Sequence, residues 1–193
     1  MFPRRSLYLF VLSALTALCS GCSGVRVRSD GTPLPQDCPR EALESMAEMG
    51  IGPSESIESM SVIVDERWGE SGKTPLVEGP VVGYLYEPYR QLPRRTRLFG
   101  QVWTGGEMVI VRYDALQVPG GRRRPFCAEV DDSGGQEKDP ASPRGVAIIP
   151  DNVAAVRLVA RYGEIDPSRP PGRLYIYRDI NDLPPKVRER LKK

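Results

Sequence analysis

Hydrophobic residues alternate with polar residues in short runs along the middle of the chain, and glycine-containing turns separate the runs. The clearest case is residues 97–130, where three apolar runs rich in β-branched and aromatic types are divided by turns at residues 104–107 and 119–121. Runs of this kind predict strands, and turns of this length join antiparallel neighbours. We therefore expect a three-stranded antiparallel meander.

Further strands are expected at residues 61–66, 80–87, 145–149, 154–162 and 174–177. Residues 38–50 and 185–193 have helical spacing of apolar positions. The 19 glycines and 19 prolines suit many short strands and turns better than a helical bundle. The pattern predicts a mainly β fold: a single small antiparallel β-sandwich or partly open barrel over residues 38–193, with short N-terminal and C-terminal helices.

The N-terminal residues 1–21 have the pattern of an export signal. Arg4 and Arg5 precede an apolar run from Leu7 to Leu18, which is too short to span a bilayer comfortably. Residues 22–37 contain prolines and show no sustained periodicity, so we expect a flexible tether of about 20 Å there.

The sequence Leu18-Cys19-Ser20-Gly21-Cys22 resembles the lipobox of bacterial lipoproteins. This resemblance implies that Cys22 is diacylated and holds the protein on a membrane of the cell envelope, since more than one acyl chain gives stable attachment. Ser23 stands where an aspartate favours inner-membrane retention in some bacteria, so the outer membrane is favoured. The alternative is an ordinary signal peptide with incidental cysteines.

Cys38 and Cys127 are the cysteines that remain after the signal and Cys22. An even pair in an oxidising exported compartment predicts a disulfide that ties the N-terminal helix to the third strand of the meander. The alternative is two buried free thiols.

Charge and composition exclude several function classes. The chain has 27 basic and 25 acidic residues, and loss of Arg4 and Arg5 with the signal leaves equal numbers, so no nucleic-acid partner is expected. The absence of histidine removes Ser-His and Cys-His catalysis and histidine-based metal sites. Residues 69–74 are two residues too short for a phosphate-binding loop, and no helix is expected after them. We therefore expect no nucleotide, metal or other cofactor, and no catalytic residue is assigned.

Aromatic residues recur in the predicted strands and could form an exposed binding face. The candidates are Tyr84, Tyr86, Trp103, Tyr175 and Tyr177. The alternative is half-buried packing, which alternating aromatics in strands often provide.

Residues 92–127 also resemble a pattern in exported proteins of bacteria with large genomes whose functions are uncharacterised. The shared features are a Leu92-Pro93 pair before the first strand, two or three strands, and Cys127 after them. This resemblance implies no activity. The first hypothesis is a non-enzymatic envelope protein that binds or assembles with another envelope protein or a cell-wall component. The alternatives are a small-ligand binding module and an envelope enzyme that uses carboxylates on a glycan.

Overall fold

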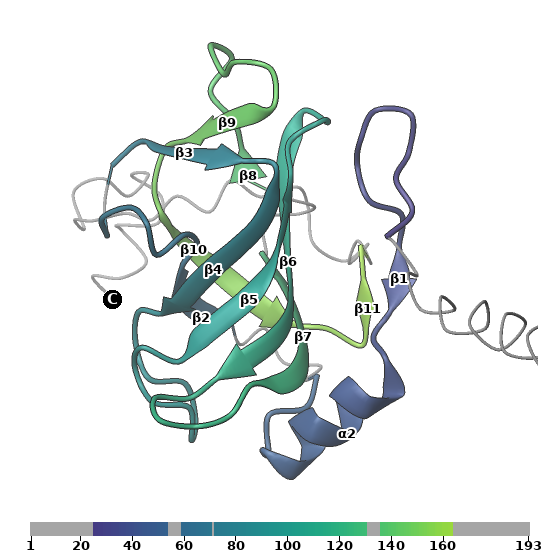
Figure 1. Ribbon diagram of the computed structural model, residues 1–193, viewed down its shortest axis with the longest axis vertical. Coiled ribbons are helices and arrows are strands. Elements are labelled where there is room, and N and C mark those ends of the chain that lie inside the picture. The colour runs from purple at the N-terminus through teal and green to yellow at the C-terminus, as the bar shows by residue number, and fades with distance from the viewer. Residues whose placement is uncertain (1–24, 54–58, 71, 131–135, 164–193) are drawn as a thin grey trace, which may run out of the picture.

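The computed structural model describes residues 25–53, 59–70, 72–130 and 136–163 (Figure 1). The expected strand at residues 174–177, the C-terminal helix at residues 185–193 and the lipobox with Cys22 lie outside the described residues. The described elements are β1 (Gln36–Asp37), α2 (Arg40–Glu48), β2 (Met60–Ile63), β3 (Thr74–Val77), β4 (Gly79–Leu85), β5 (Arg97–Trp103), β6 (Met108–Gln117), β7 (Arg124–Val130), β8 (Gln136–Glu137), β9 (Val146–Ile149), β10 (Val153–Leu158) and β11 (Arg161–Tyr162).

Six of the described strands form a barrel-like sheet. Around the ring, β2, β4, β5, β6, β7 and β10 follow one another in chain order, and each pairs antiparallel with the next. The pairing of β10 with β2, from Val153 opposite Ile63 to Val156 opposite Met60, closes the ring. The predicted mainly β, antiparallel fold is confirmed, and its architecture is a barrel-like sheet.

The three-stranded meander predicted for residues 97–130 is also confirmed. It consists of β5, β6 and β7 with the predicted antiparallel neighbours. The expected strand at residues 154–162 is divided instead, because the chain leaves the ring after Leu158 and continues as β11 on the outer face.

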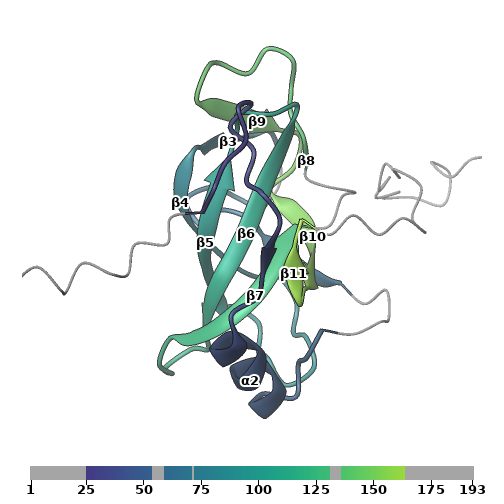
Figure 2. The same cartoon turned by 90° about the vertical axis from the view of Figure 1, so that its right-hand side faces the viewer.

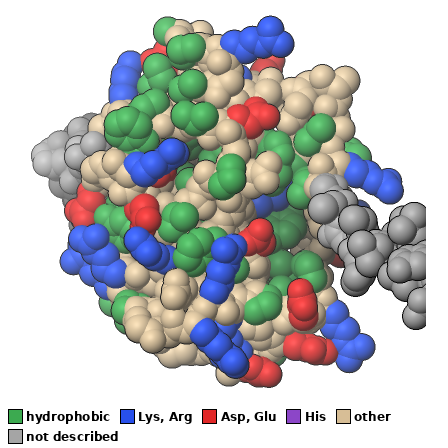
Figure 3. All heavy atoms as spheres, viewed as in Figure 1, with side chains coloured by type: hydrophobic (Ala, Val, Ile, Leu, Met, Phe, Trp, Pro, Cys, Tyr) green, Lys and Arg blue, Asp and Glu red, His purple; other side chains and the backbone are tan. Residues whose placement is uncertain are grey.

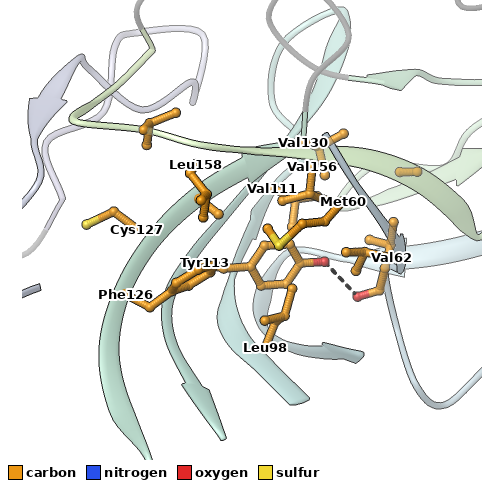
Figure 4. Close-up of a cluster of buried hydrophobic side chains, with 14 of the residues drawn as sticks. Met60, Val62, Leu98, Val111, Tyr113, Phe126, Cys127, Val130, Val156 and Leu158 are labelled. Atoms are coloured by element: carbon orange, nitrogen blue, oxygen red, sulfur yellow. Dashed lines mark hydrogen bonds between the residues drawn. The ribbon is translucent and has the colours of Figure 1, made fainter. Parts of the chain in front are cut away.

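Large apolar side chains fill the interior of the ring. Leu98, Tyr113 and Phe126 are fully buried there, and the Tyr113 hydroxyl donates a hydrogen bond to the Val64 carbonyl at 3.2 Å (Figure 4). Burial, with a smaller effect of Asp65, raises the pKa of the Tyr113 phenol. Small barrels are commonly filled by their own side chains in this way.

The N-terminal segment (residues 25–37) lies on the outside of the barrel, although a tether was predicted there. Val27 and Pro33 form an antiparallel bridge around a turn at Gly31, and β1 pairs with β11. A Cβ atom on Gly105 would lie 2.3 Å from the Asp30 carbonyl oxygen, so the turn between β5 and β6 meets the segment closely. Figure 2 shows the segment running in front of β6 and down to α2.

Helix α2 occupies the interval in which the N-terminal helix was expected. Gly50, with φ of +62°, ends it, and the amides of Gly50 and Ile51 bond back to the carbonyls of Ala47 and Met46. Met46 is fully buried, as the helical spacing implied, but Ala47 is exposed. Ala42 and Ser45 are buried instead of Ala47, so the buried face of α2 is rotated from the expected one.

The predicted disulfide between Cys38 and Cys127 is confirmed, with a Cα–Cα distance of 6.0 Å. It joins the start of α2 to β7. The amide of Cys127 also donates to the Met46 sulfur at 3.3 Å. The helix is therefore fixed to the outer face of the meander by a covalent bond and by its buried side.

Candidate functional site

The candidate site is built around an arginine on the outer face of the meander. Side chains alternate along a strand, so Val111 and Tyr113 of β6 point into the barrel and Arg112 points away from it. Arg112 is nevertheless only 5% exposed. Its guanidinium lies 5.6 Å from the ring centre of Trp103 and 5.3 Å from that of Tyr162. The arginine is buried because β11 and the N-terminal segment cover it.

Arg112 holds together segments that are far apart in the sequence. Its Nη1 donates to the Leu34 carbonyl at 2.9 Å, and its Nε lies 3.7 Å from Glu129 Oε2. Glu129 is similarly buried. It is an ion-pair partner of Arg112, and it accepts hydrogen bonds from Arg157 at 3.1 Å and from the Gly163 amide at 2.9 Å. Burial lowers the pKa of Arg112, and the charge of Glu129 opposes this effect. The result is a buried ion network that fastens both ends of the described chain to the barrel.

Tyr162 completes this layer from β11. Its hydroxyl donates to the Tyr113 carbonyl at 2.7 Å, and burial raises the pKa of its phenol. The β-strand that carries Tyr162 is only two residues long, so this hydrogen bond and the Arg112 contact supply much of its attachment.

A groove of about 550 Å³ lies beside Arg112, between the outer face of the meander, α2 and the N-terminal segment. We call it the outer groove. Its lining residues are Val25, Gln36, Pro39, Glu41, Ala42, Gln101, Trp103, Arg112, Asp114, Ala115, Arg123, Arg124, Pro125, Phe126, Cys127 and Tyr162. The volume falls within the range of small-molecule pockets.

The rim of the outer groove carries charges of both signs. Arg123 lies 3.2 Å from Asp114 and stacks 4.2 Å from the ring centre of Phe99, while Arg124 pairs with Glu48 of α2. Figure 3 shows the neighbouring face of the barrel, over β4 and β5, where basic, acidic and hydrophobic side chains also lie next to one another. An apolar wall with a mixed charged rim suits recognition of a polar partner, because rim charges set specificity while apolar area supplies affinity.

A smaller cavity of about 280 Å³ lies near β8 and β9. Lys73 pairs with Asp139 at 2.8 Å, and this hydrogen bond lowers the pKa of the Asp139 carboxyl. Lys138 donates to the carbonyls of Thr104 and Gly106. The Lys138 contacts hold the turn between β5 and β6, and the Lys73 pair joins the start of β3 to the loop after β8, so we assign the cavity a structural role.

Of the aromatic residues expected on a binding face, the three that the structure describes are not brought together on one exposed surface. Tyr84 is buried with the Arg95 guanidinium 4.6 Å from its ring centre, and half-buried Tyr86 has Arg94 at 5.4 Å. Trp103 is buried in the wall of the outer groove. Tyr175 and Tyr177 lie outside the described residues. Arginines cover the rings of Tyr84 and Tyr86, because a guanidinium stacks favourably on an aromatic face.

Sequence reasoning named Trp103 of the groove wall but missed three residues that assemble the groove: Arg112, Glu129 and Tyr162. Arg112 interrupts an apolar strand, and this single charge between Val111 and Tyr113 was the available signal. Glu129 and Tyr162 carry no local signal of their own, since their roles depend on contacts across the fold. Among the described residues, histidine, cysteine and acidic side chains form no group of three or more that could hold a metal ion.

Within the described ranges, the structure contains no helix with the length and hydrophobicity needed for a bilayer crossing. Comparison of the chain with protein-family models, with curated proteins and with solved structures gives no match. The function therefore has to be inferred from the groove and from the way the chain reaches it.

Proposed function

We propose that the protein is a lipid-anchored envelope protein that binds a partner at the outer groove and does not catalyse a reaction. The observation that carries this proposal is the placement of the groove. The interior of the barrel is filled by residues such as Tyr113 and Phe126, so a partner has to use the outer face. The outer groove, with its apolar wall and charged rim, is a hollow on that face.

The anchoring half of the proposal rests on the sequence before residue 25. Residues 1–21 serve as the export signal, and Cys22 carries the acyl chains that hold the protein at the outer membrane. The confirmed disulfide supports an exported location, because disulfides persist in oxidising compartments.

The environment of the carboxylates favours binding over glycan hydrolysis. A general-acid carboxyl needs an apolar environment that keeps it protonated near neutral pH. Asp114 on the groove rim is instead exposed and paired with Arg123. The two buried carboxylates among the described residues, Asp65 and Glu129, are each held by an arginine.

A photo-cross-linking experiment in cells tests the proposal. A photoreactive amino acid replaces Gln101, an exposed position in the groove lining, and a matched variant carries it at Val77, an exposed position on β3. We expect one dominant envelope protein or cell-wall fragment to be captured from position 101 and not from position 77. The capture is expected to disappear in the Cys22→Ala background, which releases the protein from the membrane.

The rim charge supplies a second test. Asp114→Arg reverses the exposed partner of Arg123, whereas Glu87→Arg makes the same change at an exposed site outside the groove lining. Loss of capture with Asp114→Arg alone supports binding at the groove. Equal capture from positions 101 and 77 contradicts the proposal. Hydrolysis of cell-wall glycan by the purified protein contradicts it as well.

A further inference from the structure

The described chain begins with two exposed valines and two exposed arginines in alternation. Val25 is 37% exposed and Val27 is 52% exposed. They are two of the four large hydrophobic side chains that are exposed in the described part of the protein. Arg26 and Arg28 are exposed as well. An apolar and basic stretch of this kind is the composition that favours a membrane surface, since valine enters the interfacial layer and arginine contacts lipid phosphate.

The distance to the acylated cysteine limits where this stretch can lie. Three peptide units separate Cys22 from Val25, and a fully extended chain rises at most about 3.6 Å per residue. The Cα atom of Val25 therefore lies within about 11 Å of the Cα atom of Cys22. The acyl chains place Cys22 at the bilayer surface, so Val25 stays within about 11 Å of that surface and Arg28 within about 22 Å.

Residues 25–28 do not act as a free linker between anchor and barrel. The Leu34 amide donates to the Arg26 carbonyl at 2.8 Å, and the Arg28 amide donates to the Thr32 carbonyl at 2.7 Å. Arg112 then fixes the same segment to the barrel through the Leu34 carbonyl. Residues 25–28 therefore keep a fixed orientation relative to the barrel.

We propose that residues 25–28 form a membrane-contact surface for anionic phospholipid headgroups, which holds the barrel in one orientation with the outer groove next to the bilayer. This inference rests on the proposed acylation of Cys22. Val25 belongs both to this surface and to the groove lining, so the groove opens beside the membrane. A partner in the groove is then one that is itself at the membrane surface.

The first test measures accessibility in the lipidated full-length protein. Val27→Cys and Val77→Cys introduce a thiol at two positions of similar exposure, 52% and 49%, the second on β3. In vesicles of phosphatidylcholine with 30% phosphatidylglycerol, we expect a water-soluble maleimide to label the Val27→Cys thiol at least tenfold more slowly than the Val77→Cys thiol. In the Cys22→Ser background without vesicles, both thiols are expected to react at similar rates.

The second test measures the charge dependence of binding. In the unlipidated Cys22→Ser protein, Arg26→Gln with Arg28→Gln is expected to weaken co-sedimentation with the same vesicles roughly 30-fold, about fivefold per arginine. The matched control is Arg122→Gln with Arg144→Gln, which removes equal charge from exposed positions elsewhere. We expect the control to change binding by less than threefold.

Intact mass separates failure of this inference from failure of the proposed anchoring. An acylated protein whose Val27→Cys thiol reacts as fast as the Val77→Cys thiol overturns the membrane-contact surface and leaves the anchoring intact. Equal weakening by the two double substitutions overturns it as well. A mass that shows no acyl chain on Cys22 overturns both proposals.

Discussion

Arg112 shows how one charged residue can organise a small barrel. It is as buried as the apolar residues around it, yet its partners come from four different segments. They are the Leu34 carbonyl of the N-terminal segment, the ring of Trp103 in β5, Glu129 of β7 and the ring of Tyr162 in β11. A buried ion pair gives little net stability compared with apolar residues of the same size, but removal of one member leaves the other uncompensated.

Removal of Arg112 alone is therefore expected to be costly. Arg112→Ala should lower the free energy of unfolding by about 3–5 kcal/mol, because Glu129 stays buried with a weaker partner set. The double variant Arg112→Met with Glu129→Leu should lose much less. Denaturant unfolding of both variants measures this difference. A double variant less stable than Arg112→Ala would show that the pair contributes through more than charge compensation.

The two buried tyrosines predict a loss of stability at alkaline pH. In the folded protein, the phenol pKa of Tyr113 and Tyr162 lies above the ordinary value. In the unfolded chain, both phenols have the ordinary pKa. The stability linked to these groups is therefore fully present below about pH 10 and falls as the pH rises above it. Unfolding free energies at pH 8.5 and pH 11 should differ, and Tyr162→Phe should reduce the difference. An unchanged pH dependence in Tyr162→Phe would assign the effect to Tyr113.

At the scale of elements, the disulfide and α2 together define one wall of the outer groove. The helix contributes Glu41 and Ala42 to the lining, and Cys38 fixes its first turn to β7. The helix was predictable from its apolar spacing and from Gly50. Its buried face was not predictable, because the residues that pack on it come from β7. The Glu48–Arg124 pair, which joins α2 to β7, spans more than 70 residues of sequence.

Loss of the disulfide should loosen this wall before it unfolds the barrel. The bond closes a separation of 89 residues, for which loop-closure entropy gives at most about 4–5 kcal/mol. Cys38→Ala with Cys127→Ala should lower the unfolding free energy within that limit. Hydrogen exchange should increase most in residues 40–48, while β5 and β6 keep their protection. Uniform loss of protection would show that α2 and the barrel unfold as one unit.

For the molecule as a whole, local pattern predicted the elements and long-range contacts decided the rest. The meander was predictable because its strands are joined by short turns at residues 104–107 and 119–121. Ring closure was not predictable, because the paired strands β2 and β10 are separated by about 90 residues of sequence. The outer groove was not predictable for the same reason: β1 and β11, which cover Arg112, come from opposite ends of the described chain.

The two faces of β10 provide a test of closure. Val156 is fully buried between Met60 and Val130, whereas its neighbour Ala155 is only half-buried. Val156→Asp should cost several kcal/mol or prevent folding, because it places an unpaired carboxylate inside the barrel. Ala155→Asp should cost about 1 kcal/mol or less. Thermal unfolding of the pair measures the contrast, and similar losses in both would contradict the inward direction of Val156.

The position of β10 near the end of the barrel sequence has a consequence for the export that we propose. β2 and β7 both need β10 as a neighbour, and β10 follows β2 by about 90 residues. A chain that is exported N-terminus first therefore delivers both of these strands before their shared partner arrives. Unpaired strand edges bind other chains readily. On the proposed export route, the time between the arrival of β7 and the arrival of β10 thus governs the yield of closed barrel, in competition with aggregation.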